Sequence, residues 1–333
     1  MTVKIGLIGA GGIANPHVNG YLAIPDQAKI TAVADVVKEN ADRRAEQAGG
    51  AAVFSDYNEM IKAADIDAVD ICLPHHLHAD AIIAAANAGK HILCEKPLCL
   101  TTEEGERVRA AVAANGVTLM CAHNQLFMPP VAKARELLDE GIIGKVYELR
   151  TTDSFSNKMT SSDGMGWRAH KETAGGGELI DTGYHPSYLL LYLAASEPTE
   201  VAAMVSTHKL TFSEGEDSAQ VLVRFADGKV GSIVTSWAYE PAAVTEKFSV
   251  VGENGSLWSD GKTLWHKEIR GETHTIEFPE VNAFAAEIAD FVACVRDGKR
   301  PVNTEEEGLN VLKMILGAYK SVEEKRIVAL SEL

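Results

Sequence analysis

Residues 4–14 read KIGLIGAGGIA, a short apolar run that leads directly into a glycine-rich turn. The turn fits the pattern G-x-G-x-x-G/A, here with alanine at the last position. In this pattern Gly9 permits a tight turn, Gly11 lets the backbone approach a pyrophosphate, and Ala14 lets the following helix pack close to the strand. The start of that helix presents unpaired N–H groups to phosphate oxygens. The stretch therefore predicts a strand, a helix, and between them a phosphate-binding turn that includes Gly12 and Ile13.

The residues that follow this turn alternate short β-branched runs with longer, alanine-rich amphipathic segments, as far as about Met120. Such alternation is typical of βαβ units, and near-continuous apolar runs are typical of parallel strands covered on both faces. The expected strands are residues 4–9, 30–35, 51–54, 68–73, 91–94 and 118–122. We therefore predict an α/β protein whose N-terminal Rossmann domain, with a parallel sheet, spans residues 1–122.

A carboxylate stands at the end of the second expected strand, where Asp35 follows the glycine turn by about 20 residues. At that place a carboxylate can accept hydrogen bonds from both hydroxyls of an adenosine ribose, and it repels a 2′-phosphate. Val36 and Val37 offer no cation to such a phosphate, whereas Lys38 is close enough to keep NADP open as a less favoured cofactor. The pattern thus favours NAD. The alternative is a plain strand–helix turn in which Asp35 only caps the strand.

The second half of the chain changes in character after Leu126. One expected helix, residues 130–140, precedes expected strands at residues 145–155, 200–210, 219–225, 229–237, 247–252 and 256–259. Asp227-Gly228 and Asn254-Gly255 are hairpin signals. Two helices are expected at residues 283–297 and 304–324, the second opened by a capping box of Thr304 and Glu307. These features predict a C-terminal α+β domain over residues 123–333 with a large, mostly antiparallel sheet. The last helix of this domain is free to pack back near the first domain.

Size and composition fit two globular domains, because 333 residues exceed one ordinary core. Hydrophobic residues make up 46% of the chain and charged residues 23%, and the net charge of −16 disfavours nucleic acid as a partner. The five cysteines include no Cys-x-x-Cys pair and fit reduced core residues of a cytoplasmic protein. The apolar residues 3–14 lack the basic lead of a secretory signal, and no stretch is as long and apolar as a membrane helix. No membrane association is expected.

Two further motifs carry polar residues that suit redox chemistry. The fifth expected strand ends in Glu95-Lys96-Pro97, and open parallel sheets bind ligands beyond the carboxyl ends of their strands. Residues 175–185 read GGGELIDTGYH. Together with the glycine turn, these motifs resemble the Gfo/Idh/MocA family, named after glucose–fructose oxidoreductase, inositol dehydrogenase and a rhizopine catabolism protein. The resemblance covers essentially the whole chain and implies an NAD-dependent oxidoreductase that acts on CH–OH groups.

The resemblance also implies the catalytic residues. Oxidation of a secondary alcohol removes a hydroxyl proton while a hydride leaves the same carbon for the nicotinamide. By the resemblance, His185 is the general base, Asp181 supports or orients it, and Lys96 holds the hydroxyl and stabilises developing negative charge. Asp181 and His185 are four positions apart, so in a helical segment they would share one face. Glu95 is expected either to contact the nicotinamide ribose or to pair with Lys96.

Further site residues follow from their neighbourhood in the motifs. The expected cofactor contacts are Leu73, Pro74, His75 and Asn124, and the expected substrate contacts, besides Lys96, Asp181 and His185, are Trp167, Arg168 and Tyr184. Trp167 offers an aromatic face to a sugar and Arg168 a forked donor, although core packing for Trp167 and a surface ion pair for Arg168 explain these two nearly as well. His170 and Lys171 are candidates by neighbourhood alone.

Three positions depart from the family pattern. Members commonly have an asparagine where this chain has His75, so His75 is a candidate to make the contact of that asparagine. The histidines at 75, 76 and 78 lack matching acidic or cysteine ligands, so no metal is expected there. Pro186 deletes a backbone donor, so the helix around it must start late or bend. Tyr188 stands where inositol-type relatives often have aspartate, which weakens an inositol assignment.

Three functions remain open at this point. The first is an NAD-dependent dehydrogenase for a sugar, a sugar derivative or a cyclic polyol. The second is an NAD-dependent glycoside hydrolase that works by transient oxidation, elimination and re-reduction. The third, a non-catalytic NAD-sensing protein, fits poorly with the presence of Lys96, Asp181 and His185 together. Because a large antiparallel sheet needs its exposed face covered, and relatives use that face to self-associate, a homodimer or homotetramer is expected.

Overall fold

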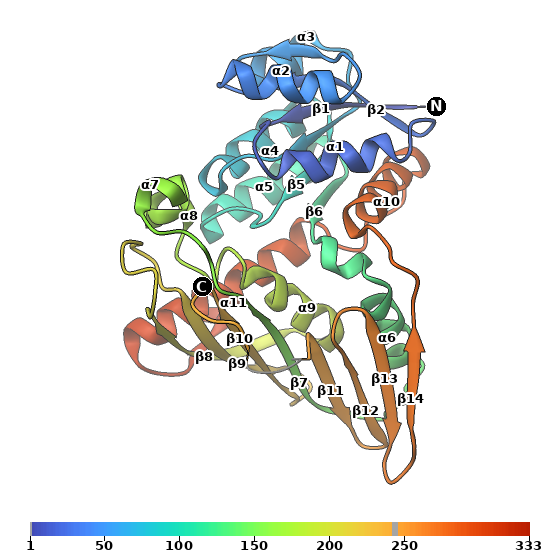
Figure 1. Ribbon diagram of the computed structural model, residues 1–333, viewed down its shortest axis with the longest axis vertical. Coiled ribbons are helices and arrows are strands. Elements are labelled where there is room, and N and C mark those ends of the chain that lie inside the picture. Colours follow the sequence, from blue (N-terminus) through green and yellow to red (C-terminus); the bar gives the residue numbers. More distant parts are fainter. Residues whose placement is uncertain (1, 242–245) are drawn as a thin grey trace. The chain divides into compact units, whose positions relative to one another are not determined.

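The structure, a computed structural model, describes residues 2–241 and 246–333, which form two compact units (Figure 1). The first unit comprises Met1–Asn124 and Asn282–Leu309, and the second comprises Gln125–Val281 and Asn310–Leu333. Residues 282–309, which the sequence analysis assigns to the second domain, thus lie in the first unit.

The first unit is built on a parallel six-stranded sheet with the strand order β3-β2-β1-β4-β5-β6. The strands are β1 (Val3–Ile8), β2 (Ala28–Ala34), β3 (Ala52–Phe54), β4 (Ala68–Ile71), β5 (His91–Glu95) and β6 (Leu119–Ala122). The order reverses between β1 and β4, and ligands of open α/β sheets bind at such a reversal. The predicted Rossmann domain with a parallel sheet is confirmed, and its six strands agree with the expected ranges to within two residues.

Helices connect these strands and cover the sheet. They are α1 (Ala14–Leu22), α2 (Lys38–Gln47), α3 (Tyr57–Ala63), the 3₁₀ helix η1 (His75–Leu77), α4 (His78–Asn87), α5 (Thr102–Asn115) and, from the far end of the sequence, α10 (Ala283–Asp297). α10 packs against α1, and Gly20 makes the approach possible, because a Cβ there would lie 2.4 Å from Cδ1 of Ile288. This close packing explains why residues 282–309 belong to the first unit.

The second unit contains a nine-stranded sheet with the order β14-β13-β12-β11-β7-β10-β9-β8-β15, antiparallel except between β7 and β10. The strands are β7 (Val146–Ser154), β8 (Pro198–Ser206), β9 (Ser218–Phe225), β10 (Val230–Ser236), β11 (Phe248–Gly252), β12 (Gly255–Ser259), β13 (Thr263–Glu268), β14 (Thr273–Glu277) and β15 (Val328–Ala329). The predicted large, mostly antiparallel sheet is confirmed, whereas β13, β14 and β15 were not predicted.

β8 ends earlier than the sequence predicts. The prediction extends it to Leu210, but Asp217 accepts hydrogen bonds from the backbone N–H groups of His208, Lys209 and Leu210. Because three consecutive N–H groups converge on one carboxylate, the chain turns there and cannot continue the ladder of the sheet.

The helices of the second unit include α9 and α6, which pack on strands of its sheet. The α-helices are α6 (Pro129–Asp139), α7 (Ser162–Met165), α8 (Lys171–Ala174), α9 (Tyr184–Ala194) and α11 (Glu305–Glu324), the last of which begins in the first unit. The short 3₁₀ helices are η2 (Asn124–Phe127), η3 (Gly166–Ala169) and η4 (Leu330–Glu332). α9 packs on β7 and β10. The opposite face exposes Met204 and Leu222, whose side chains are 82% and 58% exposed.

The capping box predicted at the start of α11 is present in part. The Thr304 N–H donates to Oε2 of Glu307 at 2.7 Å, as a capping box requires. The Thr304 hydroxyl, however, accepts from the N–H of Glu306 rather than from that of Glu307. Among the helices of residues 2–241 and 246–333, none has the length and apolar composition needed to cross a membrane.

Candidate active site

The glycine turn after β1 is held by its neighbours in the sheet. Gly9 has a φ of 87°, and a Cβ there would lie 2.4 Å from the carbonyl oxygen of Cys72, so only glycine fits. A Cβ at Gly11 or Gly12, in contrast, would meet no atom within 4 Å. These two glycines are therefore not required by packing within the chain, which fits the close approach of a pyrophosphate to the turn.

Asp35 lies at the end of β2 and ties it to the glycine turn. Its Oδ2 accepts from the N–H of Ala10 and its Oδ1 from the N–H of Val37, both at 2.7 Å. The carboxylate is therefore fixed beside the turn, with acceptor capacity left for a ribose hydroxyl. Lys38 is the cation near enough to a 2′-phosphate to leave NADP as a less favoured cofactor. Its ammonium pairs with Oδ2 of Asp42 at 2.6 Å on the exposed surface of α2.

Arg44 is a buried residue of α2 that the sequence analysis missed. Its guanidinium donates to the carbonyl of Gly11 at 3.2 Å, to Oδ1 of Asn15 at 2.9 Å and to Oε1 of Gln47 at 2.6 Å. Arg44 thus supports the glycine turn from α2. An arginine in a polar, exposed-looking helix gives no local signal of this role.

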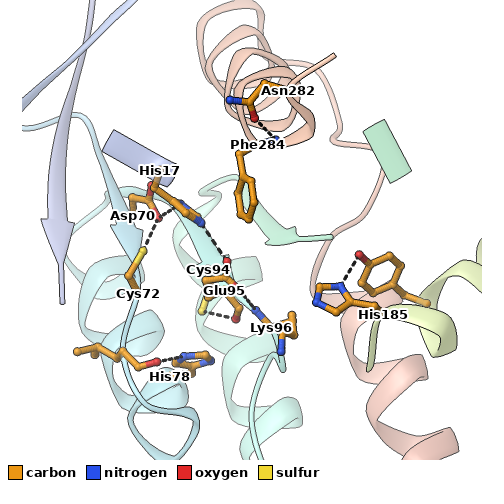
Figure 2. A network of polar contacts seen from close by, with 12 residues as sticks. His17, Asp70, Cys72, His78, Cys94, Glu95, Lys96, His185, Asn282 and Phe284 are labelled. Carbon is orange, nitrogen blue, oxygen red and sulfur yellow. Dashed lines mark hydrogen bonds and ion pairs between the residues drawn. The ribbon is translucent and has the colours of Figure 1, made fainter. Parts of the chain in front are cut away.

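Lys96 directly follows β5, and its N–H donates to Oε2 of Glu95 at 3.0 Å. Glu95 is buried and takes part in a second contact, since its Oε1 lies 3.0 Å from Nε2 of His17. The other ring nitrogen of His17, Nδ1, lies 2.9 Å from Oδ2 of Asp70. Figure 2 shows the resulting chain of contacts from Asp70 through His17 to Glu95 and the backbone of Lys96.

Electrostatics favour an ionised form of this chain of contacts. Burial alone would lower the pKa of His17, but the negative charge of Asp70 and its hydrogen bond raise that pKa well above its usual value. Burial alone would raise the pKa of Glu95, but the hydrogen bond and charge of His17 lower it. We therefore describe the three groups as an imidazolium between two carboxylates. The sequence analysis missed His17, and it passed over Asp70, a charged residue inside an apolar strand.

Cys72 lies beside Asp70 and His17, so that a nitrogen, an oxygen and a sulfur come within 4.8 Å of one another. Metal-bound cysteines are thiolates, however. Burial raises the pKa of the Cys72 thiol to about 12, and its Sγ lies 3.6 Å from Oδ1 of Asp70 as a donor. This geometry is that of a hydrogen-bonded network.

The three histidines after β4 differ in their contacts. Both ring nitrogens of the buried His78 face carbonyl oxygens, Nδ1 that of Pro97 at 2.6 Å and Nε2 that of Leu73 at 2.9 Å. Burial lowers the pKa of His78. His78 thereby connects the end of β4 to the segment after Lys96. His75 is buried edge-on against His78, with ring centroids 6.0 Å apart, and His76 is partly exposed.

The triple glycine of the second unit allows backbones to approach closely. A Cβ at Gly177 would lie 2.2 Å from the carbonyl oxygen of Glu216, and a Cβ at Gly176 would lie 2.3 Å from the hydroxyl of Tyr319. The carboxylate of Glu216 accepts from the N–H of Leu179 at 2.9 Å. These contacts fix the segment that leads to Asp181.

Asp181 does not lie in a helix, contrary to the prediction that it shares a helical face with His185. α9 begins only at Tyr184, and Asp181 lies in the turn before it. Its Oδ2 accepts from Nε of Arg168 at 2.7 Å, and the Arg168 guanidinium lies 4.2 Å from the centre of the Trp167 ring. Three of the predicted site residues, Trp167, Arg168 and Asp181, are therefore in contact.

His185 lies in the first turn of α9, and its Nδ1 is 2.8 Å from the hydroxyl oxygen of Tyr188. Pro186 is tolerated because the first turn of a helix leaves N–H groups without helical partners, so the late start expected for this helix is confirmed. Tyr184 is fully buried, which does not support its predicted substrate contact. His170, the candidate by neighbourhood, lies 3.2 Å from Glu214 on the surface.

The predicted cofactor contacts share one place in the first unit, because they all follow the carboxyl ends of its parallel strands. They are Gly9, Gly11, Gly12 and Ile13 after β1, Asp35 after β2, Leu73, Pro74 and His75 after β4, Glu95 and Lys96 at β5, and Asn124 after β6. This is the edge at which dinucleotides bind to doubly wound sheets.

Comparison with known proteins identifies related chains along the whole sequence. Residues 3–123 match the model of an oxidoreductase family with an NAD-binding Rossmann fold, and residues 131–258 match the model of the GFO/IDH/MocA C-terminal domain. Levoglucosan dehydrogenase of Pseudarthrobacter phenanthrenivorans is 32% identical, over 91% of this chain and 80% of its own length. Inositol 2-dehydrogenase of Rhizobium meliloti is 31% identical, over 99% of this chain and 100% of its own length.

A solved structure of levoglucosan dehydrogenase in complex with NADH and levoglucosan is similar over 99% of this chain and 100% of that chain, with a TM-score of 0.91 and 27% identity. These relatives confirm the predictions of an enzyme, of an oxidoreductase and of NAD as the cofactor, and they favour a dehydrogenase over a glycoside hydrolase or a sensor. The chain therefore belongs to the Gfo/Idh/MocA family of oxidoreductases.

Proposed function

We propose that this chain is an NAD-dependent dehydrogenase that transfers a hydride between a secondary alcohol of a sugar, a sugar derivative or a cyclic polyol and the nicotinamide. The observation that carries the proposal is Lys96, which follows β5 at the cofactor edge of the sheet and is anchored through Glu95 to His17. Relatives named as dehydrogenases of levoglucosan and of inositol support the substrate class.

The glycine turn and Asp35 are proposed to hold the adenosine half of the cofactor. Asp35 would accept hydrogen bonds from the ribose hydroxyls, and α1 would direct its N-terminal N–H groups at the pyrophosphate. Leu73, Pro74, His75, Glu95 and Asn124, all after later strands of the same sheet, are proposed to contact the nicotinamide half. NAD, when bound, accepts the hydride.

The proton is proposed to leave the substrate hydroxyl for His185, while Lys96 donates a hydrogen bond to the same oxygen and stabilises the charge that develops on it. Asp181 would orient the substrate or His185 from the turn before α9. Its ion pair with Arg168 brings Trp167 beside it, and Arg168 and Trp167 are proposed to contact the hydroxyls and C–H face of a sugar.

A spectroscopic screen tests the proposed function. Purified protein with NAD, and with NADP in parallel, is incubated with sugars, sugar acids, inositols, levoglucosan and glycosides, and the absorbance of the reduced cofactor is followed. We expect reduction of NAD with at least one alcohol and weaker reduction of NADP, because Asp35 repels the 2′-phosphate. Glycoside cleavage without net reduced cofactor would instead support the hydrolase, and tight NAD binding without any turnover would support the sensor.

We further propose that the chain forms a homodimer or homotetramer through the sheet face of the second unit that α9 does not cover. That face carries Met204, Leu222 and the stacked pair of Trp258 and Trp265, whose ring centroids are 6.1 Å apart. Exposed apolar patches of this kind mark association surfaces.

Light scattering at micromolar concentration checks the oligomeric state. The wild type is expected to have the mass of a dimer or tetramer, and Leu222→Glu is expected to shift it toward the monomer because a charge would be buried at the contact. The control is Ile269→Glu, which changes an exposed apolar residue outside the strands. A monomeric wild type, or an unchanged mass for Leu222→Glu, would refute the proposal.

A further inference from the structure

We propose that Glu287 of α10 carries a proton in the folded chain at neutral pH and thereby makes the packing of α10 on α1 sensitive to pH. Glu287 belongs to the first unit and has no part in the proposed hydride and proton transfers. Its side chain is fully buried, at 0% exposed. An acidic side chain in such a place needs an explanation, because glutamate is almost never fully buried unless it is paired.

Glu287 lies on the face of α10 that packs on α1. Phe284, Glu287 and Ile288 follow the spacing i, i+3, i+4 of one helix face. Ile288 lies over Gly20 of α1, and the ring of Phe284 lies 5.6 Å from that of His17, measured between centroids (Figure 2). The side chain of Glu287 is therefore directed into the contact between the two helices, near the charges around His17.

In the described part of the chain, no group pairs with a negative charge on Glu287. Within residues 2–241 and 246–333, neither of its carboxyl oxygens has a hydrogen-bond partner. The nearby cation is His17, but its two ring nitrogens already face Asp70 at 2.9 Å and Glu95 at 3.0 Å. An imidazolium has no third N–H to offer. Because a buried carboxylate without hydrogen bonds or a cation is far less stable than the neutral acid, Glu287 keeps its proton.

The charges around Glu287 also favour the neutral acid. Burial raises the pKa of Glu287 well above its usual value. The positive charge of His17 opposes this shift, whereas the negative charges of the nearby carboxylates add to it. Tyr21 brings no charge, since burial raises the pKa of its hydroxyl as well. The titratable groups near Glu287 are His17 and Tyr21 of α1, Asp70 of β4, Glu95 of β5 and Asp290 of α10.

Ionisation of Glu287 would act on the contact between α10 and α1. The imidazolium of His17 and its two carboxylates carry one net negative charge, and an ionised Glu287 would place a second one near them. Since like charges repel strongly where water is excluded, the folded chain loses stability when Glu287 gives up its proton. The helix that returns from the distant end of the sequence to cover α1 is thus held less firmly in alkaline solution.

The variant Glu287→Gln tests the inference, since it keeps the shape of the side chain and removes the titration. Urea denaturation followed by circular dichroism gives the folding equilibrium constants of both proteins at a series of pH values. The pKa of Glu287 is raised in the folded chain above the ordinary value of 4.5, so the wild type loses stability relative to the variant as the pH rises above 4.5. The ratio of the folding constants, variant to wild type, is expected to grow about tenfold per pH unit until the raised value is reached.

The opposite trend has a clear meaning. A carboxylate that is paired in the folded chain has a lowered pKa, and it would make this ratio fall as the pH rises. A ratio that falls with pH, or one that does not depend on pH, would overturn the proposal.

Two further variants separate titration from packing. Glu59→Gln makes the same change at an exposed position of α3 in the first unit, and its ratio to the wild type should not vary with pH. Glu287→Leu has no titratable group and buries no amide, so it should show the same rise with pH as Glu287→Gln, whatever its absolute stability. A rise in Glu287→Gln that is missing in Glu287→Leu would contradict the assignment of the titration to Glu287.

Infrared spectroscopy observes the proton directly. At neutral pH the wild type should show a C=O stretching band of a protonated carboxyl that is missing from Glu287→Gln and Glu287→Leu but present in Glu59→Gln. The variants are needed because burial also raises the pKa of Glu178 and Glu216 in the second unit. Identical protonated-carboxyl bands in the wild type and in a folded Glu287 variant would refute the proposal, even if the other Glu287 variant is too unstable to purify.

Discussion

Replacing Lys96 by methionine is expected to lower kcat/KM about 10²- to 10³-fold, the loss observed when one preorganised donor to a developing negative charge is removed. The side chain length is nearly conserved, so the change removes the ammonium group rather than packing. The backbone N–H of residue 96 would still donate to Glu95, because that contact needs no side chain. The dissociation constant of NAD, measured by titration calorimetry, should therefore change much less than kcat.

Lys90→Met is the matched control for this prediction. Lys90 precedes β5 at its opposite end, where its ammonium donates to the carbonyl of Ile66 at 2.8 Å. It is expected to retain activity close to that of the wild type. If Lys96→Met also retained such activity on the substrate found by the screen, Lys96 would have no role in the reaction.

Replacing His17 by leucine is expected to lower the free energy of unfolding of the first unit by about 3–5 kcal/mol, because it leaves the buried Asp70 and Glu95 without their cation. The raised pKa of His17 fixes the pH dependence. Its stabilisation is fully present below the usual pKa of 6.5 and is lost as the pH rises through the raised value. The difference between wild type and variant should therefore be largest below about pH 6.5 and shrink as the pH rises into the alkaline range.

Urea denaturation can assign this loss to one unit. All four tryptophans, Trp167, Trp237, Trp258 and Trp265, lie in the second unit, so their fluorescence reports on that unit while circular dichroism reports on both. His17→Leu should move the dichroism transition to lower urea more than the fluorescence transition. His76→Leu, which changes a histidine outside the carboxylate pair, is the control. Equal stability of the two variants would contradict the ion-pair interpretation of His17.

The sheet of the first unit was predictable because local sequence patterns mark its strands. Buried parallel strands give continuous apolar runs, and the glycine turn marks the first of them. The edge strand β14 and its neighbour β13 gave no such pattern, since β14 is almost wholly exposed and β13 carries Lys267 and Glu268 at its end. The packing of α10 on α1 was equally out of reach, because it depends on the fit of Ile288 over Gly20 between distant segments.

The candidate site was predictable only where a motif marks it. Lys96, Asp181 and His185 stand in motifs, whereas His17 acquires its role from Asp70 and Glu95, which lie 53 and 78 positions further along the chain. The hydroxyl of Tyr188 likewise meets the backbone N–H of Gln125, 63 positions away. Composition and spacing carry no information about pairs of this kind, because such pairs form only once the strands and helices have packed.

The return of α10 to α1 has a consequence for biosynthesis. The ribosome releases residues 1–124 first, but the helix that covers α1 begins at Ala283. Until then Gly20 faces no partner from α10, and the nascent Rossmann sheet must persist with one helix surface uncovered while β7 to β14 of the second sheet are synthesised. The domain that begins first is thus finished nearly last, so a ribosome that stalls within the second unit leaves an incomplete nucleotide-binding domain exposed to chaperones and proteases.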